Sequence, residues 1–591
     1  MSFTEYHLRT IIKCKQHGLH PHTVQAQAQA HAKENHRLAI EQRAKTMENQ
    51  TPALPSFNTT TLFISTLQMI DIGYPSTPFN ICLFLFILAV LLIFVAGCTP
   101  PGRRKTNPVL LPPGPKPWQL IGNLPEMLKN RPVFRWIHKL MEEMKREILC
   151  IRIGNVHIVA VSSPELGRGF LKKQDAVFSS RPKTMASDLT SSGYLSTALV
   201  PLGEQWKKMR RVVTSEVLSR ARHCWMHDKR VEEADHLVRY VFNQCAKGVS
   251  GLDLVNVCVA AQHYCMNVIR KMILGRRFFG EGMEDGGPGD EEEEHVEALF
   301  TILGNEESYG FNEEACLINV RIRQGRDREK EANDLLDVLI RLKDADGGPL
   351  LSEDEIKAQI VNVYNTLPKL GVNQFLSYSQ ELMIATVYNP SNAIEWALAE
   401  MLNRPDTFQQ ATEEHDGVVG KDRWVQESDI SQLNYVKACA WEAFRLHPIA
   451  LFNVPHVSVS HTTVAGCFIP KGSHVLLSRP GLGRNPKVWD EPLKFKPERH
   501  LKDGSKVVLA EPDLRMLSFS IGRRGCIGVN LGSTMTTMLL ARLLQGFTWS
   551  MPPNVESIEL IESVGDLFLA THSLALGRPR LAPSLYPDAQ T

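Results

Sequence analysis

Apolar and polar positions divide the amino-terminal part of the chain into segments of different character. Residues 1–46 are polar and repetitive, without apolar periodicity, and predict a disordered extension. The eighteen residues from Ile81 to Cys98 carry no charge. As a helix they would span about 27 Å, near the thickness of a bilayer core, and they lack the polar face that a buried helix normally keeps. The pattern predicts a transmembrane helix over residues 79–98, preceded by a lumenal segment over residues 47–78.

Residues 99–118 are first basic and then rich in proline. Arg103, Arg104 and Lys105 follow the apolar run directly, and positive charge beside a membrane helix favours the cytoplasmic side. The prolines of "LLPPGPKPW" fix φ and withhold N–H donors, which predicts a stiff hinge. Residues 119–591 open with the β-like runs "ILCIRIG" and "HIVAVSS" and then show helical periodicity. We expect a mainly α domain with small β-sheets.

Composition adds two constraints and one alternative. The chain has 66 Lys and Arg against 64 Asp and Glu, a net charge of +2, so no electrostatic attraction to nucleic acid is expected. The 12 cysteines show no CxxC pair and no regular spacing, which is typical of small buried side chains in a reducing compartment. Met47 is an alternative start, which would make residues 1–46 an extension of the gene model.

One cysteine differs from the others, in the stretch "FSIGRRGCIG". Cys526 lies between glycines and arginines, just before a predicted helix. Arginine charge and a helix amino terminus both favour a thiolate, which predicts a lowered pKa for the Cys526 thiol. Gly522, Gly525 and Gly528 permit positive φ and let a flat ligand approach the backbone. A solitary thiolate suits one metal ion better than a tetrahedral zinc site, which needs four ligands.

This stretch resembles the haem-binding loop of the cytochrome P-450 superfamily. The resemblance implies a cytochrome P-450 fold and a haem b cofactor, with Cys526 as the axial ligand of the haem iron. Phe519, Gly522 and Arg524 would belong to the same cofactor site. A thiolate ligand pushes electron density toward iron and favours cleavage of the O–O bond.

Three further motifs follow the order of that superfamily. "WKKMR" supplies Trp206 and Arg210, which in the family hydrogen-bond a haem propionate, a task suited to charge-assisted donors. "EAFR" supplies Glu442 and Arg445 on one helical face, and "FKPERHL" supplies Arg499. In the family these last three form a buried structural cluster, which is costly to break because removing one partner leaves an uncompensated charge.

A proline stands inside a predicted helix, in "ATVYNPSNAIEW" (residues 385–396). An interior proline costs a helix about 3 kcal/mol or more. The resembled family usually has an acid and then a threonine here, where the threonine interrupts backbone hydrogen bonding beside the oxygen site. Tyr388 occupies the acid position and Asn389 the alcohol position, and Pro390 cannot donate to the carbonyl of Thr386. The resemblance implies that Tyr388, Asn389 and Pro390 shape the oxygen site, and the alternative is that Pro390 merely kinks the helix.

Asn-Pro at this position resembles the plant amino-acid N-monooxygenases, which convert an amino acid to its aldoxime by N-hydroxylation. "NPSNA" (389–393) and "PERH" (497–500) carry this closer resemblance. It implies specialised defence metabolism, such as that of cyanogenic glucosides or glucosinolates. The implied partners are O2, an amino acid and an NADPH-cytochrome P-450 reductase, because no dinucleotide fingerprint lies in a strand-turn-helix context. The implied location is the endoplasmic reticulum membrane, single-pass, with the catalytic domain cytosolic.

The chain departs from that family in several places, among them Leu451 for a usual proline and Pro480 for a usual leucine. Tyr388 replaces the usual Asp and is a poorer proton relay at neutral pH. Val361 to Gln380 separates two halves of one family helix and resembles a retained intron, and several tens of residues of the substrate-covering region are missing after residues 295–304. Two alternatives therefore stay open, a C-hydroxylating monooxygenase of another small substrate and a non-catalytic product of a disrupted gene. The side chain of the amino-acid substrate is also left open.

Overall fold

The computed structural model describes a single compact unit within Arg104–Thr591. The described residues are 110–246, 254–277, 282–283, 286–289, 292, 318, 320–324, 331–360, 381–501, 506–508, 513–562 and 574–587. The predicted extension, lumenal segment and membrane helix lie outside these residues, as do residues 99–109 of the hinge and the block 361–380. Among the described helices, none combines the length and the apolar character that a membrane crossing needs.

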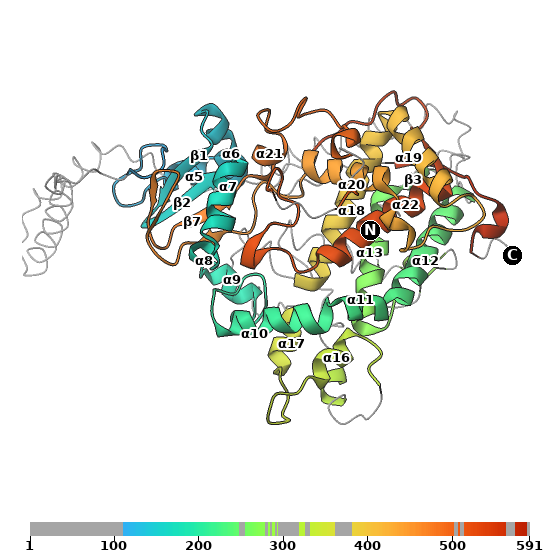
Figure 1. Ribbon diagram of the computed structural model, residues 1–591, viewed down its shortest axis with the longest axis horizontal. Helices are drawn as coiled ribbons and strands as arrows, with labels where there is room; N and C mark the ends of the chain where they lie inside the picture. The colour runs from blue at the N-terminus through green and yellow to red at the C-terminus, as the bar shows by residue number, and fades with distance from the viewer. Residues whose placement is uncertain are drawn as a thin grey trace, which may run out of the picture. The chain divides into compact units, whose positions relative to one another are not determined.

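Long helices form the larger part of the unit (Figure 1). Helix α18 (Glu381–Leu402) lies at the centre, where it packs against α13 (Val257–Leu274), α20 (Asn434–Leu446) and α22 (Val529–Gly546), and α12 (His227–Ala246) covers α13. The other α-helices are α5 (Leu124–Lys129), α6 (Val133–Glu143), α7 (Pro164–Arg168), α8 (Asp175–Phe178), α9 (Met185–Thr190), α10 (Glu204–Val212), α11 (Arg220–Trp225), α16 (Leu335–Arg341), α17 (Glu353–Ile360), α19 (Pro405–Val418) and α21 (Arg479–Gly483). Wider π-helical turns continue α7 over Gly169–Lys173 and α10 over Val213–Val217.

Helix α13 illustrates how the sequence sets these elements. Asn256 precedes the helix, and its side chain accepts a hydrogen bond from the Val259 N–H at 3.2 Å, which satisfies one of the free donors of the first turn. Gly275 ends the helix in the left-handed conformation, with φ of 66°. Nearly every residue between them is buried. The helix is thus buried on all sides, including polar residues such as Asn267 and Arg270, and its apolar side chains form part of the main core with α18 and α22.

Three small β-sheets complete the fold. The four-stranded sheet has the order β1-β2-β7-β4, with β1 (Ile148–Ile153), β2 (Val156–Val161), β7 (His474–Leu477) and β4 (His456–Val457). Strands β1 and β2 form an antiparallel hairpin, and β7 runs parallel to β2 with His474 opposite Ile158. The other sheets join β3 (Leu254–Asn256), β9 (Leu574–Pro579) and β8 (Phe547–Ser550), and β5 (Thr462–Val464) with β6 (Cys467–Ile469).

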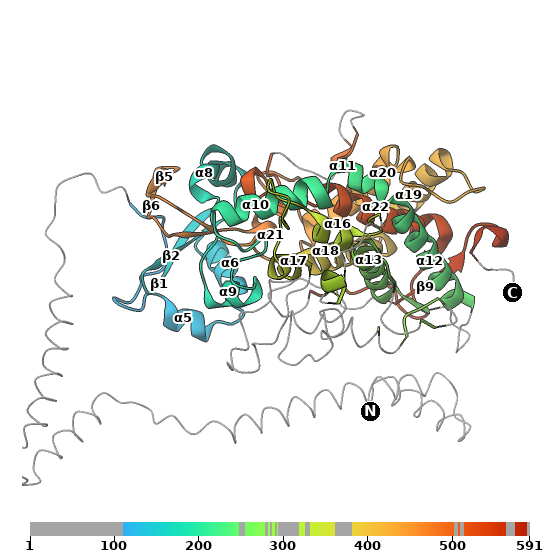
Figure 2. The same cartoon turned by 90° about the horizontal axis from the view of Figure 1, so that it is seen from below.

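The four-stranded sheet and the long helices occupy opposite ends of the unit. Both views show β1 and β2 beside α5 and α6 at one end, and α12, α19 and α22 at the other (Figures 1 and 2). Helix α10 runs between the two ends. The prediction of a mainly α domain with small sheets is confirmed, and its two β-like runs are β1 and β2.

Candidate functional site

The loop before α22 holds Cys526 in a fixed orientation. A short 3₁₀ turn, Gly522–Arg524, precedes it, and the Cys526 N–H donates to the Phe519 carbonyl at 2.8 Å. Gly522 has φ of +76°, and a Cβ there would lie 2.6 Å from the Leu171 carbonyl oxygen, so only glycine fits. The predicted positive φ is present at Gly522, whereas Gly525 and Gly528 have φ of -54° and -87° and do not use this freedom. The loop is short and hydrogen-bonded to itself, and these bonds fix the backbone of Cys526.

The prediction of a lowered thiol pKa for Cys526 is wrong. Part of the side chain is accessible, but the surrounding protein desolvates the sulfur, and this burial raises the pKa of the Cys526 thiol. The Gly528 N–H and the charges of Arg210 and Arg479 act in the opposite direction and offset only part of that effect. The sequence argument counted the positive charges and omitted desolvation. A bound metal cation would favour the thiolate here, because its charge deprotonates a coordinating thiol.

Helix α10 brings its two predicted cofactor residues to this loop. Trp206 and Arg210 are one helical turn apart, and the Arg210 guanidinium donates to the Gly525 carbonyl at 2.9 Å. The Trp206 ring is 7% exposed. Its indole N–H is buried, and no acceptor among the described residues lies within hydrogen-bond distance of it. A buried N–H of this kind normally has a partner.

Arg524 lies over the same indole ring. Its guanidinium carbon is 4.5 Å from the Trp206 ring centroid, a cation–π geometry. The guanidinium also donates to three backbone carbonyls, those of Ser179 at 2.6 Å, Thr197 at 3.3 Å and Val200 at 2.6 Å. Arg524 therefore ties the Cys526 loop to the segment that precedes α10. The structure brings Trp206, Arg210 and Arg524 together around one loop.

A second polar group, centred on Glu442, is fully buried in α20. Arg445 donates to the Glu442 carboxylate through two nitrogens, at 2.8 and 2.7 Å, and Arg499 donates to it at 3.0 Å. The structure thus joins the three residues that the sequence proposed as a cluster. It adds His500, whose Nε2 lies 2.7 Å from the carboxylate, and the Lys496 backbone N–H at 2.9 Å. The sequence signal for His500 was present in "PERH", but its role had not been assigned.

These donors change the ionisation of Glu442. Burial alone would raise the pKa of a carboxyl group, but hydrogen bonds from Arg445 and His500 outweigh it and lower the pKa of Glu442 to about 2. Burial lowers the pKa of His500, and the neighbouring Glu442 carboxylate counteracts only part of this. The cluster is thus an anion held by two arginines, with a neutral imidazole as a further donor. It is structural, because all of its groups are engaged with one another.

Helix α18 continues through Pro390 over its whole length. Tyr388 is 2% exposed. The residues on either side of the proline donate hydrogen bonds from their side chains to backbone carbonyls one turn earlier. Asn389 Nδ2 donates to the Ala385 carbonyl at 3.0 Å, and Ser391 Oγ donates to the Val387 carbonyl at 2.6 Å. Such bonds let a polar side chain take part in the backbone ladder near a break. Ser391 was missed from sequence, where only Asn389 was considered for this role.

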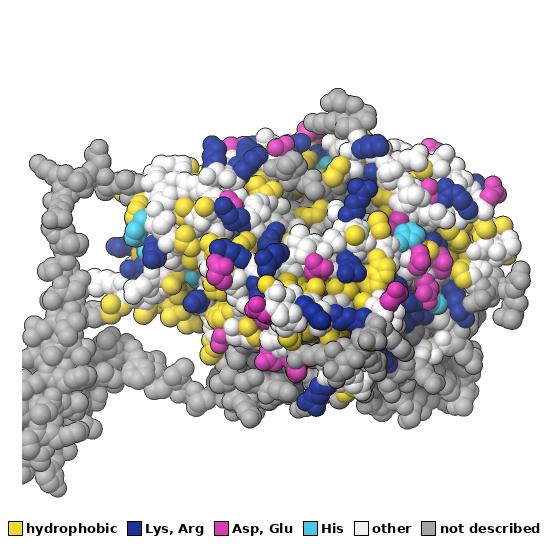
Figure 3. Space-filling view, turned by 60° about the horizontal axis from the view of Figure 1, so that its bottom comes forward, with side chains coloured by type: hydrophobic (Ala, Val, Ile, Leu, Met, Phe, Trp, Pro, Cys, Tyr) yellow, Lys and Arg dark blue, Asp and Glu magenta, His cyan; other side chains and the backbone are white. Residues whose placement is uncertain are grey.

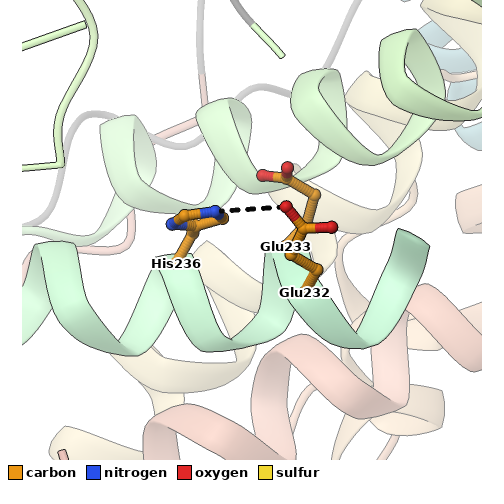
Figure 4. A group of neighbouring side chains, drawn as sticks. All are labelled: Glu232, Glu233 and His236. Atoms are coloured by element: carbon orange, nitrogen blue, oxygen red, sulfur yellow. Dashed lines mark ion pairs between the residues drawn. The ribbon is translucent and has the colours of Figure 1, made fainter. Parts of the chain in front are cut away.

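A separate cluster of potential metal ligands lies on α12. Glu232, Glu233 and His236 point toward one another (Figure 4). Cations already pair with both carboxylates, however. Lys271 contacts Glu232 and lies 3.4 Å from Glu233, and Arg277 Nε lies 2.9 Å from Glu233 Oε2. The two negative and two positive charges balance, so the group is an ion-pair network that joins α12 to α13 and the segment after it.

Comparison with known proteins places the chain in a family. The cytochrome P450 family model matches residues 112–574, which is most of the chain. A solved cytochrome P450 of zebra fish, in complex with abiraterone, superimposes with a TM-score of 0.60 at 22% identity, over 76% of this chain and 100% of that one. The chain belongs to the cytochrome P450 family and has its fold.

Among the relatives, amino-acid N-monooxygenases of plants are prominent. A phenylalanine N-monooxygenase of Prunus mume is 54% identical over 80% of this chain and 92% of its own length. Valine N-monooxygenase 1 of Manihot esculenta is 51% identical over 85% of this chain and 94% of its own length. Tyrosine N-monooxygenase of Sorghum bicolor is 51% identical over 83% of this chain and 90% of its own length. The protein is thus a haem-dependent monooxygenase of this family.

The residues around the Cys526 loop fit the family's haem. Trp206 offers a buried N–H donor that has no acceptor among the described residues, and a carboxylate at that place would satisfy it. Haem carries such carboxylates as propionates. Arg210 and Arg524 supply positive charge beside the same ring. The cofactor expected from the sequence is therefore chemically compatible with the donors that the fold assembles.

Proposed function

We propose that the protein N-hydroxylates an amino acid and so converts it to the aldoxime, in specialised defence metabolism. One observation carries this proposal. Relatives named for phenylalanine, valine and tyrosine match this chain almost equally well, at 51–54% identity. Their side chains differ, whereas the oxidised amino group is common to all three. The shared reaction is therefore better supported than any particular side chain.

The chain's own residues supply the framework for that reaction. When bound, haem with a thiolate ligand supplies the activation of O2. Cys526 holds the iron, and Trp206 and Arg210 bind the propionates together with Arg524. Phe519 and Gly522 shape the loop through the Cys526 N–H bond and the positive φ.

Tyr388, Asn389 and Pro390 border the oxygen site on α18. Pro390 has no N–H, so the helix has a permanent gap in its donors there, and Asn389 and Ser391 place polar groups beside it. An α-amino acid brings its own ammonium and carboxylate groups. We propose that these groups take over the proton handling that an acid and a threonine perform elsewhere in the family.

The redox partner proposed is an NADPH-cytochrome P450 reductase. Exposed cations lie in the Cys526 loop and on the segments that contact it, namely Arg523, Lys172, Lys173, Lys207 and Arg211, of which Lys207 pairs with Glu204 and Arg523 with Asp175. Figure 3 shows that Lys and Arg side chains are numerous on one face of the unit, with Asp and Glu between them. A basic surface favours the approach of a partner with an acidic one. We place both proteins at the endoplasmic reticulum membrane, with residues 79–98 as the single anchor, 47–78 lumenal and the catalytic domain cytosolic, on the basis of the sequence pattern alone.

The test is product analysis with reductase and NADPH supplied, using a panel of amino acids. We expect little or no aldoxime from the chain as it stands, because the block 361–380 enters directly before α18 and Tyr388 replaces an acid. A repaired chain lacking residues 361–380, carrying Tyr388→Asp and the covering segment of an intact relative, should form aldoxime.

Other products would decide between the alternatives. A carbon-hydroxylated product from the repaired chain, without aldoxime, would contradict the proposal and favour the C-hydroxylase. Haem binding and reduction without any product from the panel would do the same and favour a non-catalytic protein. Equal turnover by the unmodified and repaired chains would refute the argument that the inserted block disrupts the site.

A further inference from the structure

Helix α17 is fastened to α10 by a buried carboxylate. Glu355 is 6% exposed. Lys208 Nζ lies 2.7 and 2.8 Å from its two oxygens, and Gln205 Nε2 donates to one of them at 2.9 Å. Lys208 and Gln205 are three residues apart on α10 and so lie on one face of that helix. One carboxylate of α17 therefore holds two consecutive turns of α10.

The orientation of Glu355 is itself fixed by the start of α17. The Ser352 N–H donates to the Glu355 carboxylate at 2.8 Å, and the Glu355 N–H donates to Ser352 Oγ at 3.1 Å. This reciprocal pair is a capping box, which satisfies two free donors of the first turn and holds the glutamate rotamer. Burial raises the pKa of Glu355, but hydrogen bonds from Lys208, Ser352 and Gln205 lower it overall, so the carboxylate is ionised at neutral pH.

A second contact of α17 reaches the segment held by Arg524. Thr197 Oγ donates to Gln359 Oε1 at 2.6 Å, and both residues are buried. The Thr197 carbonyl accepts from Arg524 at 3.3 Å. Glu355 and Gln359 are four residues apart, on one face of α17. That face thus touches both segments that flank the Cys526 loop.

We propose that Glu355 and Gln359 are positioning residues for the haem. The inference rests on the proposed contacts of Trp206 and Arg210 with the propionates. Lys208 lies between these two residues in the sequence of α10, so a shift or rotation of the helix displaces their donors together. A donor must be held within a few tenths of an ångström to keep its hydrogen bond short and straight. Glu355 holds α10 and Gln359 holds Thr197, and each controls cofactor donors that it does not touch.

The decisive experiment measures haem release from the purified holoprotein into excess apomyoglobin. We expect Glu355→Gln, which removes the charge and keeps the shape, to speed haem release about tenfold and to shift the ferric Soret band. The matched control is Glu353→Gln on the same helix. The Glu353 side chain is 41% exposed, and its contact with Lys357 is long, with 3.9 Å between Lys357 Nζ and Glu353 Oε2. This control should release haem at the wild-type rate.

Two further variants keep the test decisive if Glu355→Gln folds poorly. Thr197→Val removes only the hydrogen bond to Gln359 and should also speed release, by a few fold. The single variants Lys208→Met and Glu355→Gln each leave one partner of the ion pair without its counter-charge. The double variant leaves neither partner unpaired, so its rate of haem release should rise by less than the product of the two single-variant increases.

A lowered melting temperature with unchanged haem release and Soret position, in both Glu355→Gln and Thr197→Val, would overturn the proposal in favour of a purely structural contact. Haem release does not depend on the substrate. A repaired chain that retains haem but forms no aldoxime would therefore contradict the proposed reaction and leave this inference standing.

Discussion

Replacing Glu442 by alanine should prevent the protein from accumulating with haem. The carboxylate is fully buried and accepts hydrogen bonds from Arg445, Arg499 and His500. Without it, two guanidinium groups face each other with no counter-charge. Arg445 is itself 0% exposed and keeps only backbone carbonyls, such as that of Gly483 at 2.5 Å.

Two estimates of the free energy of unfolding lost in Glu442→Ala agree. Removing one partner of a buried ion pair costs about 3 to 5 kcal/mol. The fall in the pKa of Glu442 from its ordinary value of 4.5 to about 2 corresponds to about 3 kcal/mol in favour of the folded, ionised state. Typical domains are stable by about 5 to 15 kcal/mol, so the loss removes a large part of the total.

The pKa also fixes the pH at which this contribution disappears. The folded-state pKa lies below the unfolded one, so the stabilisation is complete above pH 4.5 and is lost as the pH falls toward about 2. The acid unfolding transition of the wild-type protein should therefore include this carboxyl group. In a Glu442→Gln variant, stability should depend less on pH in that window.

The assay is haem content per purified protein and the thermal unfolding midpoint, with Glu442→Asp expected to be intermediate. The control is Glu491→Ala in the same region. Glu491 pairs only with exposed lysines, and the Arg499 bond at that position goes to its backbone carbonyl at 3.3 Å, which alanine keeps. Normal haem content and an unchanged midpoint in Glu442→Ala would refute the buried-cluster reasoning.

Three other variants give separate expectations. Cys526→Ser should abolish the shifted Soret band of the carbon monoxide complex, because an alcohol is a far weaker ligand than a thiolate; a fully retained band would exclude Cys526 as the ligand. Trp206→Phe keeps an aromatic side chain but loses the buried N–H donor, and should weaken haem retention about tenfold in an apomyoglobin transfer assay; unchanged retention would contradict a propionate contact. His415→Leu should raise the unfolding midpoint, and more so at pH 5 than at pH 8. His415 is fully buried, neither ring nitrogen has a hydrogen-bond partner in the described part of the chain, and burial lowers its pKa to about 4. The unfolded chain therefore binds a proton between about pH 6.5 and 4 that the folded chain excludes, so wild-type stability falls with pH in that window; an equal effect of the variant at both pH values would refute this.

Local sequence signals predicted the positive φ of Gly522 and the approach of Trp206, Arg210 and Arg524 to the Cys526 loop. Around Cys526 the glycines, arginines and following helix lie within a few residues of one another, so their conformational and chemical roles can be inferred without the rest of the fold. The same holds for Trp206 and Arg210, which share one helical face. The broad class, mainly helical with small sheets, followed from periodicity, which is also a short-range property.

What could not be predicted depends on packing between distant segments. His500 joins Glu442 across 58 residues and Thr197 joins Gln359 across 162, and no periodicity specifies such pairs. The pKa of Cys526 was misjudged for a related reason. Nearby charges are visible in the sequence, whereas desolvation depends on how many protein atoms surround the sulfur.

The pairing of β7 with β2 has a consequence for the order in which the protein folds. Ile158 and His474 lie side by side although more than 300 residues separate them. Strand β3 likewise pairs with β9, which lies near the carboxyl end of the chain. At about 5 to 20 residues per second, a ribosome needs about 15 to 60 seconds to make that stretch. During this time the β1–β2 hairpin exists without its neighbour, and an isolated hairpin is only marginally stable and has an open edge that invites aggregation. A nascent chain that stops before residue 474 can complete neither sheet, and the edge of its hairpin stays open until the last fifth of the protein emerges.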